Sequence, residues 1–329
     1  MNNEPKNLLE VSDLTVQYVT DDAIVHAVND FNLQLVKGEA RGLVGETGAG
    51  KTTLALSILR LLPERVGRIT KGSIIYEGED ILKIPEAEML PLRGKKISMI
   101  FQDPMTSLNP THTVGEQIFE VLDLHFPEMS KAEKDAKVDE MMKLVGIPPE
   151  RKGSFPHEFS GGMKQRVVIA MALIAQPELL LADEPTTALD VTIQAQILEL
   201  MRELREKFNT SVLLITHDLG VVAQFCDSVS VVYGGRVVEY GSIEQVFERR
   251  SNHPYTAGLF NCIPDLNDDQ PRLHPIPGMM ADPRVIYEGC CFAKRCEHAC
   301  DRCYKEMPAM HVCNGHGIMC HLYEDKEEF

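Results

Sequence analysis

The sequence lacks three features, and each absence excludes a class of protein. Its longest apolar run, Val167 to Ala175, is about half of what a helix needs to cross ~30 Å of hydrocarbon. Positive charge is scarce: 33 Lys and Arg face 49 Asp and Glu, for a formal net charge of -16. Such a charge repels nucleic-acid phosphates. There is also no internal repeat. We therefore expect no membrane-spanning segment and no DNA or RNA partner.

The first ten residues also lack the apolar core of a signal peptide, so we expect the chain to stay in the cytosol. Any membrane role must then come through a partner, which would hold the chain at the cytoplasmic face of the cell membrane. A length of 329 residues is compatible with one large α/β domain and an appendage.

Strand and helix patterns alternate along most of the chain. Phe31, Leu33 and Leu35 share one face of a predicted strand, and Arg41 to Val44 runs into a glycine-rich turn that a helix over 52–62 should follow. Two buried strands are predicted over 179–182 and 212–216, with a helix between them over 191–207. A hairpin with a Gly-Gly turn is predicted over 229–240. This alternation indicates an α/β fold with a mainly parallel sheet and an antiparallel β part.

A mostly helical subdomain is predicted from about 103 to 176, where Ser130 and Glu133 read as a capping box and Gly146 as a helix end. Prolines become frequent and periodicity fades near residue 250. We therefore predict a nucleotide-binding domain over 1–250 and a small, cysteine-rich extension over 251–329.

A glycine-rich segment after the predicted strand has the spacing of a P-loop. Its glycines let backbone N–H groups and the next helix N-terminus bind phosphate, Lys51 should reach the β- and γ-phosphates, and the Thr52 hydroxyl should bind Mg²⁺. The alternative is a glycine turn that merely contains a lysine, but the flanking strand and helix disfavour it. The predicted nucleotide-binding residues here are Gly45, Glu46, Thr47, Gly48, Ala49, Gly50, Lys51, Thr52 and Thr53.

The apolar strand 179–182 ends in two carboxylates. Asp183 suits Mg²⁺ coordination, and Glu184 can act as a general base on the attacking water. Alone, this pair would read as a solvated acidic turn. Together with a P-loop, it predicts a catalytic site.

The segment Phe159-Ser160-Gly161-Gly162-Met163-Lys164-Gln165 resembles the ABC signature sequence, which opens a helix and forms a second anion site. The order of the motifs supports this resemblance: P-loop, Gln102, signature, Asp183-Glu184, Asp190 and His217. The resemblance implies that two nucleotide domains pair head to tail. ATP then lies between the P-loop of one subunit and the signature of the other, where Ser160, Gly161 and Gly162 act in trans.

The same resemblance implies roles for four further residues. Gln102 contacts Mg²⁺ and the nucleophilic water, and His217 contacts the γ-phosphate. Asp190 lies in a loop that crosses the dimer interface, and Tyr18 stacks on adenine. An isolated strand-end histidine or aromatic is more often a packing residue.

The signature departs from the commonest Leu-Ser-Gly-Gly-Gln by Phe159 and Met163. The segment Phe159 to Arg166 resembles the signature of the dipeptide and oligopeptide importer branch. The segment His253 to Thr256 resembles the same branch. That branch implies two permease subunits, an extracytoplasmic binding protein and a second, paralogous ATPase subunit. Its members also transport nickel and some sugars.

Seven of the nine cysteines lie between Cys290 and Cys320. In a reducing compartment such clustering indicates metal. Resemblance to the same branch implies a [4Fe–4S] cluster on Cys290, Cys296, Cys303 and Cys320. Zn²⁺ bound by the Cys300–Cys303 pair with neighbouring thiols or histidines is an open alternative, as is a set of unmetallated thiols. Cys296, Cys300 and Cys303 also have the spacing that radical S-adenosylmethionine enzymes use. The chain lacks the repeated β/α pattern of the barrel in those enzymes, which disfavours this class.

Other functional classes are less compatible with the sequence. Chromosome-organising ATPases need long coiled coils between P-loop and signature, and here about a hundred residues separate the two motifs. Translation-factor ATPases usually carry two cassettes in one chain. The cysteine-rich extension could act as a redox sensor or as a structural site, and the spacing of its cysteines is compatible with both.

Overall fold

The computed structural model describes residues 7–187, 189–248, 250–263, 275–324 and 326. Residues 1–6 of the N-terminal segment therefore lie outside the described part of the chain. Within the described residues, no helix combines the length and the apolar character needed to cross a membrane. The chain divides into two compact units. Of the described residues, the first comprises residue 7, 35–40 and those within 83–215, and the second 8–34, 41–82 and those within 216–326.

The first unit contains three parallel strands in the order β6, β7, β8. These strands are β6 (Ile97–Ile100), β7 (Leu179–Asp183) and β8 (Ser211–Thr216). Every residue of β7 and β8 is buried, which explains the apolar runs Leu179 to Ala182 and Val212 to Ile215 within them. The helix between them, α7 (Val191–Phe208), ends at Asn209 in the left-handed region. The predicted strands and their connecting helix are confirmed.

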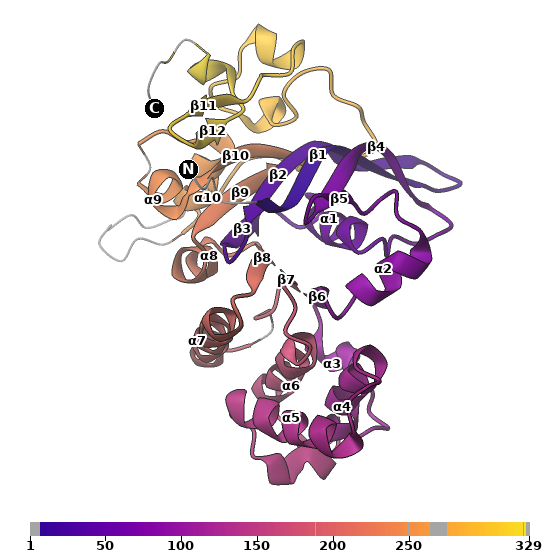
Figure 1. Ribbon diagram of the computed structural model, residues 1–329. Helices are drawn as coiled ribbons and strands as arrows, with labels where there is room; N and C mark the ends of the chain where they lie inside the picture. Colours follow the sequence, from indigo (N-terminus) through magenta and orange to yellow (C-terminus); the bar gives the residue numbers. More distant parts are fainter. Residues whose placement is uncertain (1–6, 188, 249, 264–274, 325, 327–329) are drawn as a thin grey trace, which may run out of the picture. The chain divides into compact units, whose positions relative to one another are not determined.

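Helices form the rest of the first unit, and Figure 1 shows α4, α5 and α6 beside one another. Capping boxes start α4 (Val114–His125) and α5 (Lys131–Leu144), the second through Ser130 and Glu133 as predicted. Gly146 follows α5 with a φ of +74°. The remaining helices are α2 (Glu86–Leu92), α3 (Pro104–Ser107), α6 (Gly161–Leu173) and the 3₁₀ segments η1 (Pro149–Gly153) and η2 (Pro156–Glu158).

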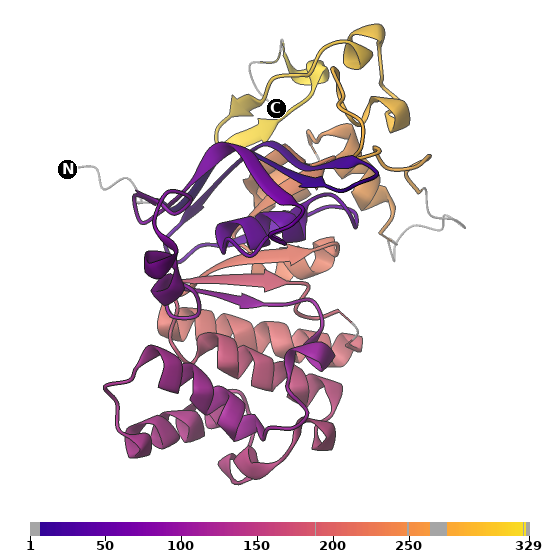
Figure 2. The same cartoon turned by 90° about the vertical axis from the view of Figure 1, so that its right-hand side faces the viewer.

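The second unit contains an antiparallel sheet in the order β2, β1, β4, β5. Figure 2 shows these strands in indigo and purple with α1 (Lys51–Ile58) against one face. The strands are β1 (Asn7–Val19), β2 (Ile24–Val36), β4 (Gly67–Tyr76) and β5 (Glu79–Asp80). Phe31, Leu33 and Leu35 are buried on one face of β2, as their alternation predicts.

A mixed sheet completes the second unit. β3 (Ala40–Val44) pairs in parallel with β9 (Ser228–Tyr233), which forms a hairpin with β10 (Arg236–Ser242). Gly234 and Gly235 have φ of +56° and +78°, the two positive values that a tight hairpin turn requires. The predicted hairpin is confirmed. Around it lie the helices α8 (Leu219–Phe225), α9 (Ile243–Phe247) and α10 (Pro254–Asn261).

The cysteine-rich extension adds two strands to this sheet, with β12 (His316–Ile318) on β10 and β11 (His311–Cys313) outermost. Short 3₁₀ turns complete it: η3 (Ala293–Arg295), η4 (Asp301–Tyr304) and η5 (His321–Tyr323). Tyr255, Phe292 and Met319 share a buried core with strand residues such as Tyr233. The extension shares this core because it packs on β9 and β10.

Candidate functional site

The P-loop passes from β3 into α1 through backbone that suits glycine. Gly48 and Gly50 have φ of +85° and +98°, in the region that L side chains rarely adopt. Gly45 has no room for a side chain, because a Cβ there would lie 2.2 Å from the carbonyl oxygen of Val232. A close-fitting loop that ends at a helix N-terminus binds phosphate through backbone N–H groups. The loop has the shape that this chemistry needs.

The side chain of Lys51 is buried within the loop. Its Nζ donates hydrogen bonds to the carbonyl oxygens of Gly45 at 2.6 Å and of Glu46 at 3.0 Å. Thr52, the predicted Mg²⁺ ligand, is exposed at the first turn of α1. Tyr18 is bonded to the same helix, because its Oη lies 3.1 Å from Thr53 Oγ1. Its stacking on adenine stays a prediction.

The two carboxylates after β7 differ in conformation. Asp183 is 2% exposed and ends the strand, whereas Glu184 adopts a φ of +47°, which is uncommon for a residue other than glycine. The Glu184 carboxylate accepts hydrogen bonds from Gln102 Nε2 at 3.1 Å and Thr187 Oγ1 at 2.9 Å. The structure thus brings together Gln102 and Glu184, two residues predicted separately. Thr187 was missed, since no sequence pattern singled it out.

The signature segment opens α6 with Ser160 as the N-cap. Ser160 Oγ accepts a hydrogen bond from the backbone N–H of Met163 at 3.4 Å, and both Ser160 and Gly161 are exposed. Gly162 faces α7, where a Cβ would lie 2.6 Å from Ile193 Cγ2. The exposed helix start suits a second anion site, whose action in trans stays a prediction.

Asp190 and His217 lie at the ends of elements. Asp190 caps α7, because its Oδ1 accepts a hydrogen bond from the backbone N–H of Ile193 at 3.0 Å. His217 directly follows β8 and is exposed, and the next residue, Asp218, caps α8. The hydrogen bond at the start of α7 is the contact that the structure shows for the Asp190 side chain. The place of Asp190 at a dimer interface stays a prediction.

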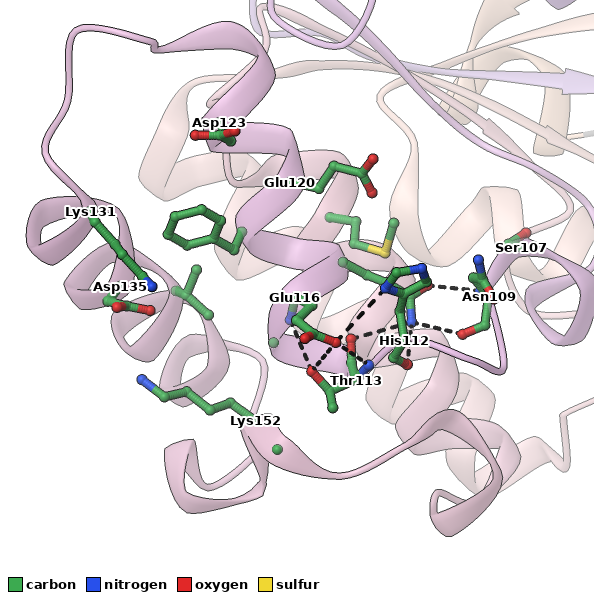
Figure 3. Close-up of a pocket in the computed structure, with 16 residues that line it drawn as sticks. Ser107, Asn109, His112, Thr113, Glu116, Glu120, Asp123, Lys131, Asp135 and Lys152 are labelled. Carbon is green, nitrogen blue, oxygen red and sulfur yellow. Dashed lines mark hydrogen bonds and ion pairs between the residues drawn. The ribbon is translucent and has the colours of Figure 1, made fainter.

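A groove of about 780 Å³ opens among the helices of the first unit (Figure 3). Carboxylates outnumber ammonium groups in its lining. The charged lining residues are Glu116, Glu120, Asp123, Asp135, Lys131 and Lys152. A hollow of about 330 Å³ shares Ser107, Gln117, Glu120 and Met171 with this groove. Its other lining residues are mostly apolar, among them Phe101 and Leu124. Leu124 is 73% exposed, which is high for a large apolar residue.

The four predicted cluster cysteines influence one another electrostatically. Burial, together with the neighbouring thiols of Cys291, Cys303 and Cys296, raises the pKa of Cys290 to about 12. Cys320 has a pKa raised to about 11 by burial and by the other three predicted ligands. Burial raises the pKa values of Cys296 and Cys303 as well.

Even so, no group of three or more His, Cys, Asp or Glu side chains is arranged to hold a metal ion in the part of the chain that the structure describes. The [4Fe–4S] and zinc predictions are not supported by this arrangement. Cys291, one of the surplus thiols, is a core residue whose Sγ lies 3.7 Å from the Tyr233 carbonyl oxygen. Cys300 and Cys303 have their sulfurs 3.6 Å apart.

Two residues of the extension contact the P-loop, and sequence reasoning did not assign them a role. The backbone N–H of Glu46 donates to Tyr255 Oη at 3.0 Å, and Arg295 forms an ion pair with the Glu46 carboxylate at 2.9 Å. Tyr255 lies in the segment His253 to Thr256 that carries the resemblance, and Arg295 directly precedes the predicted ligand Cys296. Tyr255 and Arg295 lie 209 and 249 residues from Glu46 in the chain, so local sequence patterns do not predict these contacts.

A P-loop, a buried strand that ends in two carboxylates and a serine-capped glycine helix define an α/β ATPase. The family described as "ABC transporter" matches residues 28–187, and the family described as "Oligopeptide/dipeptide transporter, C-terminal region" matches residues 238–303. The chain belongs to the ATP-binding subunits of ABC transporters, in the oligopeptide/dipeptide branch. As a member of that family it hydrolyses ATP with Mg²⁺.

Individual relatives cover nearly the whole chain. The oligopeptide transport ATP-binding protein OppD of Salmonella typhimurium is 51% identical over 93% of this chain and 91% of its own length. The dipeptide transport ATP-binding protein DppD of Bacillus subtilis is 46% identical over 98% and 97%. Among solved structures, the dimeric ATP-binding cassette MJ0796 bound to ADP and phosphate aligns with a TM-score of 0.64 and 28% identity, over 71% of this chain and 98% of that one. These likenesses confirm the predicted ABC-type α/β fold.

Proposed function

We propose that this chain powers the import of dipeptides or oligopeptides as one of two ATPase subunits on a pair of permease subunits. The observation that carries the proposal is the likeness, over 93% of the chain or more, to ATP-binding proteins named for oligopeptide and dipeptide transport. An extracytoplasmic binding protein would deliver the peptide. The chain would reach the membrane through its permease partners.

The second ATPase subunit is proposed to be a paralogue. Ser160, Gly161 and Gly162 would then face ATP held by that subunit's P-loop, and Asp190 would lie at the shared interface. The exposure of Ser160 and Gly161 at the start of α6 supports this, because a helix N-terminus used in trans must be accessible. Closure of the two subunits on ATP and reopening after hydrolysis would drive the permease.

The chemical roles follow from the local geometry of each motif. Thr52 and Asp183 would hold Mg²⁺, which neutralises charge on the phosphates. Lys51 would exchange its bonds to the loop carbonyls for the β- and γ-phosphates. Glu184 would take a proton from the attacking water, and the Gln102 amide would orient the carboxylate and that water. His217 would stabilise the γ-phosphate.

We propose that the groove in the first unit receives a cytoplasmic helix of a permease subunit. Its carboxylate-rich lining favours basic side chains on that helix, and the apolar hollow with exposed Phe101 and Leu124 favours an apolar face. A Leu124→Asp substitution should weaken permease binding without altering ATP binding by the subunit. Co-purification of the complex measures the first and nucleotide titration the second.

We propose that Cys290, Cys296, Cys303 and Cys320 hold a structural [4Fe–4S] cluster, on the ground that these positions resemble the cysteines of the oligopeptide/dipeptide branch. Anaerobic purification followed by iron, sulfide and zinc analysis distinguishes it from zinc and from free thiols. Cys320→Ser should abolish iron binding, and Cys313→Ser should not. Iron retained by Cys320→Ser would contradict this ligand set.

The division into 1–250 and 251–329 is likewise proposed as a functional one, with the extension stabilising the ATPase. Because Tyr255 and Phe292 share a core with Tyr233, a chain truncated after residue 250 should lose thermal stability.

Isolation of the complex and reconstitution in vesicles test the function. Peptide-loaded binding protein should stimulate ATP hydrolysis, and Lys51→Ala should weaken nucleotide binding and remove the activity. Stimulation by nickel or sugars instead of peptides would overturn the proposed cargo. Co-purification with nucleic acid and no permease would overturn the transport function itself.

A further inference from the structure

The extension holds one P-loop residue with a bidentate ion pair. Arg295 Nη1 donates to Glu46 Oε2 at 2.9 Å, and Arg295 Nη2 donates to Glu46 Oε1 at 3.1 Å. The Arg295 side chain is 6% exposed and that of Glu46 27%. Paired hydrogen bonds between a guanidinium and a carboxylate fix both distance and orientation. The ion pair is therefore a defined contact rather than a loose surface pair.

The rest of the extension positions this guanidinium. Its remaining donors bond to the carbonyl oxygens of Pro277 at 2.9 Å and Ile276 at 3.3 Å. Tyr233 Oη accepts a further hydrogen bond at 3.4 Å. With these partners, Arg295 is anchored to backbone outside the P-loop before it reaches Glu46.

Glu46 is bound at three points. Its carboxylate is bonded to Arg295, its N–H to Tyr255 Oη, and its carbonyl oxygen to Lys51 Nζ. Glu46 thus links Arg295 to Lys51, the residue that we expect to bind the phosphates. An uncompensated carboxylate in a phosphate-binding loop would repel the β- and γ-phosphates, and a buried guanidinium offsets that repulsion.

We propose that Arg295 is a positioning residue for ATP binding: it neutralises Glu46 and holds that side chain away from the phosphate site, so the extension sets the nucleotide affinity of the P-loop. This inference rests on ATP binding by the P-loop. Arg295 acts through Glu46, whose carboxylate accepts hydrogen bonds from both of its Nη atoms.

The test is a double-mutant cycle on the full chain, with ATP affinity measured by displacement of a fluorescent ATP analogue. Arg295→Met should weaken ATP binding about tenfold, within the usual range of coupling between two sites. With Glu46→Gln in place there is no carboxylate to neutralise. Arg295→Met should then change the affinity by less than about threefold.

Arg284→Met is the matched control. Arg284 makes a bidentate pair with Asp282 in the same region of the chain, at 2.9 and 2.7 Å, and this pair does not include a P-loop residue. Its loss should leave ATP affinity unchanged. The inference is overturned if Arg295→Met binds ATP as tightly as the unmodified chain. It is also overturned if Arg295→Met is equally harmful with and without Glu46→Gln, which is the signature of a merely structural residue.

Arg295→Lys serves if the methionine variant does not fold. It keeps the charge with fewer donors and should weaken ATP binding less than about tenfold, with the loss again reduced by Glu46→Gln. If Arg295→Lys changes the ATP affinity by the same factor with and without Glu46→Gln, or leaves it unchanged in both backgrounds, the inference is overturned. Failure of the unmodified chain to bind ATP would instead overturn the ATPase function, so the two failures are distinguishable.

Discussion

Glu184 shows how the site depends on single residues. Its left-handed backbone, with a φ of +47°, turns the residue sharply at the end of β7, and the chain accepts this conformation because the backbone N–H bonds to the Ile215 carbonyl oxygen at 2.8 Å. Uncommon backbone conformations of this kind occur at functional sites, where surrounding contacts maintain them. Gln102 and Thr187 then fix the carboxylate.

Glu184→Gln should preserve ATP binding and reduce hydrolysis about 100- to 10,000-fold, because the amide keeps the shape and removes the base. Single-turnover hydrolysis in the assembled transporter measures the loss. Glu199→Gln, an exposed residue of α7 paired with Arg202, is the control and should hydrolyse ATP normally. Normal turnover by Glu184→Gln would show that another group is the base.

At the scale of elements, α6 packs against α7 at Gly162, where a methyl group would lie 2.6 Å from Ile193 Cγ2. Gly162→Ala should therefore lower the stability of the protein by about 1–3 kcal/mol. Adding Ile193→Ala should relieve the clash. We expect the double variant to match Ile193→Ala in its denaturant midpoint while ATP hydrolysis stays low, since the methyl group also narrows the anion site. Recovery of hydrolysis together with stability would assign Gly162 a packing role only.

Strands β6 and β7 are tied at their start by Glu178, which receives hydrogen bonds from Lys37 at 2.7 Å and from Lys96. Burial alone would raise the pKa of Glu178, but the two lysines outweigh it and lower the pKa to about 2. A carboxylate with a depressed pKa stabilises the fold above its unfolded pKa, near 4.5, and loses that contribution as pH falls toward 2.

Glu178→Gln should consequently destabilise the protein by about 1–2 kcal/mol at pH 7, after allowance for solvent screening. The difference from the unmodified chain should shrink as pH falls from 4.5 toward 3. Urea midpoints at several pH values measure it, with Glu199→Gln as the control that shows little pH dependence. A difference that stays constant below pH 4.5 would contradict this assignment.

For the whole molecule, local sequence patterns predicted the elements well and long-range contacts poorly. The hairpin at Gly234-Gly235, the capping box at Ser130 and the buried strands β7 and β8 depend on neighbouring residues, so the sequence displays them directly. The P-loop likewise carries its geometry in its glycines.

The contacts between distant segments could not be predicted. The packing of Phe292 and Tyr255 around Tyr233, and the Glu46–Arg295 pair, join residues far apart in the chain. Such contacts depend on how the extension packs on β9 and β10, which periodicity does not encode. Thr187 was missed for a similar reason, because its role comes from the turn that Glu184 makes.

The proposed head-to-tail arrangement of two ATPase subunits makes a prediction that separates trans from cis. If Ser160 serves ATP bound by the partner subunit, Lys51→Ala and Ser160→Ala in this chain affect different sites of the assembled transporter. Each single variant should then retain ATP in one of two sites, whereas the double variant should retain none. If Ser160 acted in cis, the double variant would retain as much nucleotide as either single variant. Nucleotide retained per purified complex measures the outcome. Glu199→Gln should retain the full amount, because an exposed α7 residue belongs to neither site.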